Sequence, residues 1–217
     1  MNSKQQIVAN TASYVKETLS GESTGHDWHH IERVRKLALR IGREERADLF
    51  IVELGALLHD IADWKFYGDS SVGAEKARAF LQAQQVEAEV IDKVCYMVEN
   101  ISFKGGTGSK RMHILEGKIV QDADRLDAMG AIGVARCFAF GGYKGRELYN
   151  PDIPPMHHKS FDEYKKYVGT SLNHFDEKLL LLLELMNTEA GRRIAQGRHD
   201  YLVQFKERFL KEWEGEM

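Results

Sequence analysis

The sequence predicts an all-α fold with a single domain. All of the chain's prolines, Pro151, Pro154 and Pro155, fall in one short segment, so helices elsewhere escape the interruption that proline causes. Along most of the chain, apolar residues recur at steps of three and four, which is the spacing of one helix face. We find no repeat, low-complexity tract or long linker, and 217 residues are enough to bury one hydrophobic core.

The helical spacing is clear in the segment that precedes residue 46. There Val34, Leu37, Ala38 and Ile41 form one apolar face. Other segments show the same period, and together they account for most of the chain. The predicted helices lie near residues 5–19, 26–45, 48–63, 71–84, 87–100, 115–139, 160–187 and 188–213.

Helix start signals stand at three of the expected positions. Asp48 precedes the helix predicted near 48–63, and Ser71 precedes the next one. Ser160 is followed three residues later by Glu163, which is the spacing of a capping box.

Two stretches break the helical pattern. Residues 101–113 are rich in Gly, Ser and Lys, and residues 141–158 are rich in Gly and Pro with aromatic and charged residues among them. Both are predicted to be loops. Loops on a rigid helical scaffold often carry binding groups, so both stretches are candidates for ligand contacts.

Composition excludes several classes of protein. Hydrophobic residues make up 43% and charged residues 29%, as in ordinary globular proteins, and the net charge of −3 argues against a nucleic-acid or membrane partner. Two cysteines, Cys95 and Cys137, are too few for a disulfide framework and are expected to be buried free thiols in a reducing compartment. The N-terminus lacks an apolar signal segment, and the apolar run 179–186 falls short of the roughly 20 residues of a membrane helix. These features predict a cytoplasmic location.

The segment ELGALLHDIADWK, residues 53–65, ends an apolar run with a His-Asp pair, His59-Asp60. A buried imidazole and carboxylate each need a partner, and a metal ion is one such partner. The dipeptide alone does not decide the matter, because it also occurs at 26–27 and 199–200.

Two further polar residues interrupt apolar patterns on other helices. His30 stands four residues before Val34 on the buried face of its helix, and Asp124 follows an aliphatic segment. Asp122 and Asp127 compete with Asp124, and spacing alone does not choose among them. The alternatives are a core histidine and an aspartate that caps a helix or pairs with a nearby arginine. A site of two imidazoles and two carboxylates favours Mn, Fe, Co or Ni, with Mg also possible, over zinc, which prefers fewer ligands.

Three stretches together resemble a known signature. HIERV from residue 30, LLHDIAD from residue 57 and VQDADRL from residue 120 are similar to the H…HD…D pattern of the HD-domain metal-dependent phosphohydrolases. The resemblance implies a helical domain of the HD type, with a metal-binding core at about 26–140 and C-terminal helices at 160–213 packed on it. It selects His59-Asp60 among the three pairs, and Asp124 among its neighbours. The implied metal ligands are His30, His59, Asp60 and Asp124.

The resemblance covers nearly the whole chain. GHDWHHIERV, ENISFKGG, EGKIVQDADRLDAMGAIGVAR, FAFGGYKGR and SLNHFDEKLLLL resemble a branch of small stand-alone bacterial HD hydrolases. That branch is associated with hydrolysis of nucleoside triphosphates to monophosphate and pyrophosphate by metal-activated water. Where two-metal HD proteins add histidines after the dyad, this chain has Asn100, which implies one tightly held metal. A phosphodiesterase, a 5′-nucleotidase or a non-catalytic metal-binding module are the alternatives.

Six residues around the dyad and in the loops are candidates for substrate chemistry. Asp63, one turn beyond His59, is expected to orient the attacking water, and His26, one turn before His30, to protonate the leaving oxygen. The alternatives are a helix-ending Asp and a polar helix start. The partner expected is a small-molecule nucleotide, with a homodimer possible. The predicted phosphate or base contacts are Lys65, Lys104, Tyr143 and Arg146. The alternative for each is a solvated surface residue.

A further basic cluster near the C-terminus is expected to lie on an exposed charged face; it contains Arg192, Arg193 and Arg198.

Overall fold

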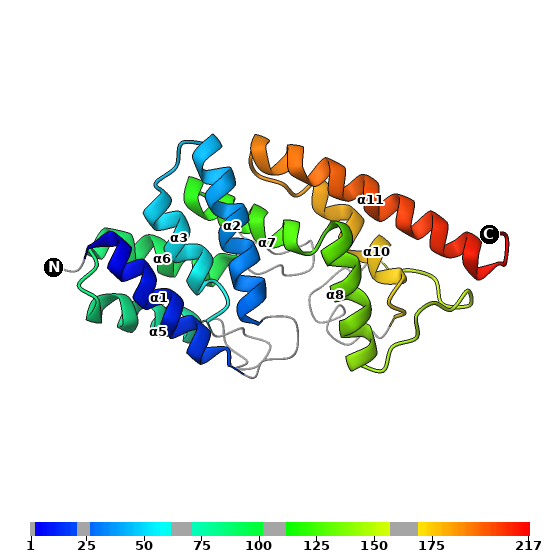
Figure 1. The fold of residues 1–217 in the computed structure, drawn as a ribbon, viewed down its shortest axis with the longest axis horizontal. Coiled ribbons are helices and arrows are strands. Elements are labelled where there is room, and N and C mark those ends of the chain that lie inside the picture. Colours follow the sequence, from blue (N-terminus) through cyan, green and yellow to red (C-terminus); the bar gives the residue numbers. More distant parts are fainter. Residues whose placement is uncertain (1–2, 21–26, 62–70, 102–111, 157–168) are drawn as a thin grey trace. The chain divides into compact units, whose positions relative to one another are not determined.

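The computed structural model describes residues 3–20, 27–61, 71–101, 112–156 and 169–217, and every regular element among them is a helix (Figure 1). This confirms the predicted all-α class. The contacts divide the chain into two compact units. The first unit comprises Met1–Phe103 and Ser109–Ala123, and the second comprises Lys104–Gly108 and Asp124–Met217. The predicted extent of the metal-binding core stays a prediction.

Helix α3 lies at the centre of the first unit. It contacts α1, α2 and α6, and most of its residues are buried, because its sequence is apolar apart from Glu53. Helices α5 and α6 pack against each other, and Tyr14 of α1 stacks on Phe80 of α5 with ring centroids 4.3 Å apart. The helices of this unit that precede residue 101 are α1 (Lys4–Thr18), α2 (Trp28–Glu44), α3 (Leu49–Leu58), α5 (Ser71–Ala83) and α6 (Ala88–Asn100).

The first unit also tests the predicted helix starts. The Asp48 carboxylate accepts hydrogen bonds from the backbone N–H groups of Phe50 and Ile51, as expected of a residue that caps α3. Ser71 is the first residue of α5 rather than the residue before it. The proposed capping box at Ser160 and Glu163 lies outside the described residues.

The helix predicted at 115–139 is wrong as a single element. The chain forms α7 (Leu115–Asp127), then a two-residue turn, then α8 (Gly130–Tyr143). Gly130 adopts a φ of +66°, which favours glycine, and a side-chain carbon at Gly133 would lie only 2.2 Å from the Ala128 carbonyl oxygen. A glycine at either position also fits a helical pattern, so the sequence does not reveal the break between α7 and α8. The turn at Ala128 and Met129 can form because Gly130 and Gly133 have no side chain. Helix α7 begins in the first unit and ends in the second.

The prediction of one helix at 160–187 is also wrong where the structure describes the chain; residues 157–168 are outside it. Two short elements replace the helix, α10 (Asn173–Glu177) and the 3-10 helix η1 (Leu179–Leu183). Lys178 separates them with φ −146° and ψ −56°, outside helical values. A 3-10 helix aligns residues three apart, and it buries Leu179 and Leu182 together.

Helix α11 (Glu189–Trp213) is the long element of the second unit and follows the prediction of 188–213. Thr188 caps it by accepting a hydrogen bond from Gly191 N–H at 3.0 Å. The helix packs on α8 and η1, which Figure 1 draws beside it. Phe205 and Phe209 of α11 contact Phe138 of α8 at ring-centroid distances of 5.9 Å each.

The two predicted loops have different outcomes. Helix α8 continues to Tyr143, so residues 141–143 are helical, while 144–156 are irregular as predicted. Most of the stretch 101–113 lies outside the described residues. None of the helices in the described part of the chain combines the length and apolar character that a membrane span requires.

Candidate metal centre

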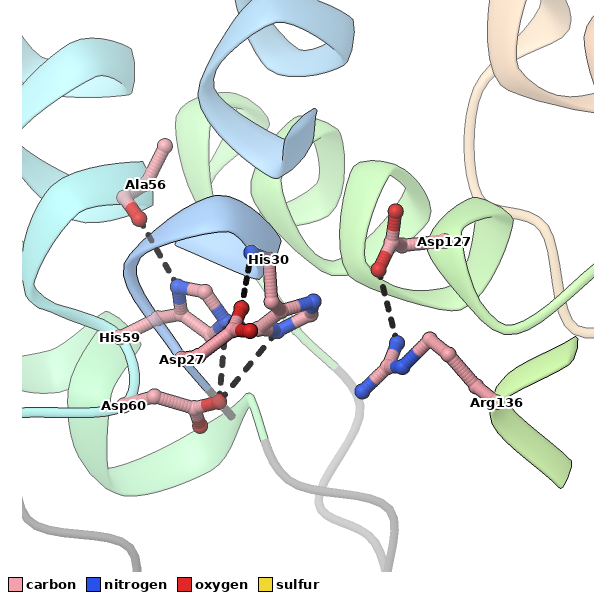
Figure 2. Close-up of polar contacts among 7 residues, drawn as sticks. All are labelled: Asp27, His30, Ala56, His59, Asp60, Asp127 and Arg136. Carbon is pink, nitrogen blue, oxygen red and sulfur yellow. Dashed lines mark hydrogen bonds and ion pairs between the residues drawn. The ribbon is translucent and has the colours of Figure 1, made fainter. Parts of the chain in front are cut away.

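Three predicted ligands meet in the first unit. His30 lies in the first turn of α2, and His59 and Asp60 follow immediately after the last residue of α3 (Figure 2). The two Nε2 atoms are 3.3 Å apart, and the Asp60 Oδ2 atom is 3.4 Å from His30 Nε2 and 3.5 Å from His59 Nε2. All three side chains are buried, with His30 fully so.

The local backbone orients both imidazoles. Asp27 caps α2 by accepting a hydrogen bond from the His30 N–H at 2.8 Å, which fixes the backbone of the first turn, where His30 lies. The His59 Nδ1 atom lies 2.8 Å from the Ala56 carbonyl oxygen. A carbonyl can only accept, so Nδ1 carries a proton, and in the neutral ring the lone pair is then on Nε2, which faces His30 and Asp60. This is the tautomer that a metal-binding histidine needs, with its other nitrogen held by a carbonyl.

The donor set fits a divalent metal ion. Three atoms separated by 3.3–3.5 Å have a common centre roughly 2 Å from each, which matches ordinary metal–nitrogen and metal–oxygen bond lengths. Two imidazoles and one carboxylate on one side of an ion form a donor set that suits Mn, Fe, Co or Ni. Among the described residues, one group of three or more His, Cys, Asp or Glu side chains is close enough to share an ion. It consists of His30, His59 and Asp60.

Residues 27–129 match the HD domain family model, and this range contains the whole buried group. The chain is also 41% identical to YpgQ of Bacillus subtilis strain 168 over 204 residues. These residues cover 94% of this chain and 92% of YpgQ. The chain belongs to the HD-domain superfamily. This confirms the family predicted from the H…HD…D pattern, and His59-Asp60 is the HD pair within the matched residues.

Two solved structures support the assignment. An HD-superfamily hydrolase from Bacillus thuringiensis is 43% identical, with a TM-score of 0.78, covering 98% of this chain and 99% of that one. YpgQ of Bacillus subtilis in complex with ADP is 37% identical, with a TM-score of 0.73, covering 94% of this chain and 96% of that one. The chain is therefore a hydrolase of the HD superfamily, similar to YpgQ.

Three aspartates competed for the remaining ligand of the HD pattern. Asp124 is half-buried on α7 and belongs to the second unit, so its part in binding the ion stays a prediction. Asp127, which is 1% exposed, pairs with Arg136 of α8 at 2.8 Å (Figure 2). Asp122 is fully buried.

The other predicted site residues fall into two groups. Tyr143 is the last residue of α8, not part of a loop, and is 62% exposed. Arg146 lies in the irregular segment that follows, with its guanidinium carbon 5.9 Å from the centre of the Phe140 ring. Both residues belong to the second unit. The remaining candidates lie outside the described residues: His26, Asp63, Lys65 and Lys104.

The other His-Asp pairs have structural contacts of their own. Asp27 caps α2, and Asp200 on α11 accepts a hydrogen bond from the Gln196 side chain at 2.8 Å. The capping role was not predicted, although an aspartate before an amphipathic segment is a recognised start signal.

Both cysteines are free, as predicted; Cys95 is buried as expected, whereas the residue Cys137 is only half-buried. Burial raises the pKa of Cys137 to about 12, and burial also raises the pKa of Cys95. Neither thiol is a ready metal ligand or nucleophile, because both stay protonated at neutral pH.

Proposed function

We propose that this HD hydrolase depends on one divalent metal and cleaves ribo- or deoxynucleoside triphosphates to monophosphate and pyrophosphate. The observation that carries the proposal is the close, buried group of His30, His59 and Asp60 on the HD pattern. The ADP bound to YpgQ supports a nucleotide as the substrate class. Cleavage between the α and β phosphates is the expectation drawn from the resemblance to the small stand-alone HD hydrolases.

His30, His59 and Asp60 would hold the ion, with Asp124 as the proposed fourth ligand. When bound, a divalent ion lowers the pKa of a coordinated water and polarises a phosphoryl oxygen. The protein's own contribution is to fix its donors before the ion arrives. The hydrogen bond from His59 to the Ala56 carbonyl and the cap at Asp27 support such a preorganised site.

The proposed catalytic residues flank these ligands in the sequence. Asp63 would accept a hydrogen bond from the attacking water, four residues after His59. His26, four residues before His30, would donate a proton to the leaving oxygen. Lys65 would offset negative charge on the phosphates.

Substrate contacts are proposed for Lys104, Tyr143 and Arg146. The side chains at the end of α8 support a substrate contact for Tyr143 and Arg146. Tyr143 is an exposed aromatic residue, and the Lys144 ammonium lies 5.1 Å from its ring centre. An aromatic surface bordered by cations suits a base that stacks and phosphates that carry charge.

A metal and substrate screen tests the proposed reaction. Metal-stripped protein would be loaded with Mn, Co, Ni or Mg and given nucleoside mono-, di- and triphosphates, and the products would be separated by chromatography. We expect equal amounts of monophosphate and pyrophosphate from triphosphates. Release of orthophosphate would instead identify a nucleotidase, and cleavage of diester substrates would identify a phosphodiesterase.

A matched pair of variants ties the activity to the HD pair. Asp60→Ala is expected to abolish both metal binding and turnover. Asp200→Ala alters the equivalent carboxylate of another His-Asp pair, which is exposed on α11, and should leave both unchanged. Full turnover in Asp60→Ala would contradict the proposed mechanism, and metal binding without turnover in the unmodified protein would indicate a non-catalytic module.

A further inference from the structure

An arginine links the two helices that carry the metal-binding histidines. Arg35 of α2 donates through Nε and Nη2 to Oε1 of Glu53 on α3, at 2.9 and 2.6 Å. Its Nη1 donates to Glu32 one turn earlier on α2, at 2.9 Å. The three side chains are 19–27% exposed, so water screens this contact less than it screens a surface ion pair.

Helices α2 and α3 run antiparallel. The end of α2 approaches the start of α3, where Gly42 lies against Leu49, and the start of α2 approaches the end of α3, where His30 meets His59. Arg35 is five residues beyond His30, and Glu53 is six residues before His59. The ion pair therefore lies at matching levels on the two helices, about one and a half turns from the histidines.

Aliphatic packing contributes to this register through shape alone, without directional bonds. The buried face of α2 after His30 is formed by Ile31, Val34, Ala38 and Ile41, and most of α3 is aliphatic too. Similar side chains can interdigitate after a shift, whereas a guanidinium fork requires its carboxylates in defined positions. A slip of one helical turn would displace His59 by about 5.4 Å, more than the whole separation of 3.3 Å between the two Nε2 atoms.

We propose that Arg35, held by Glu32 and Glu53, is a positioning residue that sets the register of α2 on α3 and so keeps His30 and His59 at metal-binding distance. This inference rests on the proposed metal site. It does not depend on which nucleotide, or which phosphate bond, the hydrolase cleaves.

The test measures metal affinity rather than turnover. Co²⁺ would be titrated into metal-stripped protein by calorimetry, and the visible absorption of bound Co²⁺ would report the ligand geometry. Arg35→Met keeps the aliphatic stem and removes the hydrogen bonds. We expect about a tenfold weaker Co²⁺ affinity and an altered Co²⁺ spectrum, in line with the loss of other groups that orient metal ligands.

The matched control is Arg78→Met. Arg78 on α5 pairs with Asp92 on α6 at 2.8 Å in the same unit, and that pair also joins two helices, but neither carries a predicted ligand. The control should leave the Co²⁺ affinity and spectrum unchanged. Thermal unfolding of the metal-free variants separates a general loss of stability from a displaced histidine.

Unchanged Co²⁺ affinity and spectrum in Arg35→Met would overturn the proposal. If Arg35→Met fails to fold, Arg35→Lys replaces it, since a lysine keeps the charge but cannot form the same paired hydrogen bonds. Weaker Co²⁺ binding by folded Arg35→Lys supports the proposal, and Co²⁺ affinity equal to that of the original protein overturns it. If the unmodified protein binds no Co²⁺, the proposed metal site and this inference both fail. If it binds Co²⁺ but hydrolyses no nucleotide, the proposed reaction alone fails.

Discussion

The junction between α7 and α8 makes a sharp prediction about Gly133. A side-chain carbon added there would lie 2.2 Å from the Ala128 carbonyl oxygen and 2.4 Å from its carbonyl carbon. Close carbon–oxygen contacts in proteins are about 3.3 Å, so the backbone of the turn would have to move by about 1 Å. Overpacking costs about 1–3 kcal/mol, and a clash with backbone belongs at the upper end of that range. Gly133→Ala should therefore lose about 3 kcal/mol of unfolding free energy.

The matched control for Gly133→Ala is Gly197→Ala on α11. Both glycines are helical and belong to the second unit, but beyond the adjoining backbone of its own helix no atom lies within 4 Å of a side-chain carbon added at Gly197. Removing a glycine from an open helix position stabilises a protein by about 0.4–1 kcal/mol. At about 2–4 °C per kcal/mol, thermal unfolding followed by circular dichroism should show a fall of about 6–12 °C for Gly133→Ala and a small rise for the control. A rise in both variants would refute the tight junction.

Three further predictions concern single side chains. Burial raises the pKa of the Cys137 thiol to about 12, so this thiol stays protonated in the folded chain at pH values where the thiol of the unfolded chain has ionised. Its contribution to the free energy of unfolding is therefore complete below about pH 8.5 and is lost as the pH rises toward 12. Cys137→Ala should flatten that part of the curve of stability against pH. Asp63→Ala should keep Co²⁺ affinity while lowering kcat by about 10²–10⁴-fold, and an unchanged kcat would remove Asp63 from the mechanism. Tyr143→Ala should raise KM for nucleotides with about 1–3 kcal/mol of lost binding while unfolding at the same temperature, because an exposed side chain contributes little to packing.

Helices α2 and α11 were predictable from their apolar spacing, and their bounds lie within two residues of those predicted. The start of α3 was also predictable, because Asp48 caps it as expected, but the helix ends at Leu58 and not at residue 63. The break before α8 was not predictable, because a glycine-rich segment fits both a helix and a tight junction until the contact with Ala128 is known. The prediction of an α-helix over the leucine run before α11 was wrong for a different reason. Five leucines in succession, Leu179–Leu183, carry no period that separates an α-helix from a 3-10 helix.

Three of the four predicted ligands lie together, because polar residues in an apolar pattern marked the candidates and the resemblance to the HD pattern selected among them; the place of Asp124 stays a prediction. His30, His59 and Asp60 each interrupt a buried face, and a burial cost of this kind needs a compensating partner. The contacts that hold the group in place were not predictable. Arg35 and Glu53 are eighteen residues apart and have the composition of ordinary surface residues, so only the packing of α2 on α3 reveals their pairing.

Metal binding should also stabilise the folded chain. His30, His59 and Asp60 are already within 3.5 Å of one another, so the ion should bind the folded state far more tightly than the unfolded chain.

A ligand at a hundred times its Kd adds about 2.7 kcal/mol, which corresponds to a rise of about 5–11 °C in the unfolding temperature. Asp60→Asn keeps the shape of the side chain and removes its charge, so this variant should lose most of the rise, while Asp200→Asn should retain it. An equal rise in both variants would mean that the ion binds somewhere other than the buried group. The test thus locates the ion without reference to any reaction, and it separates the metal site from the chemistry proposed for it.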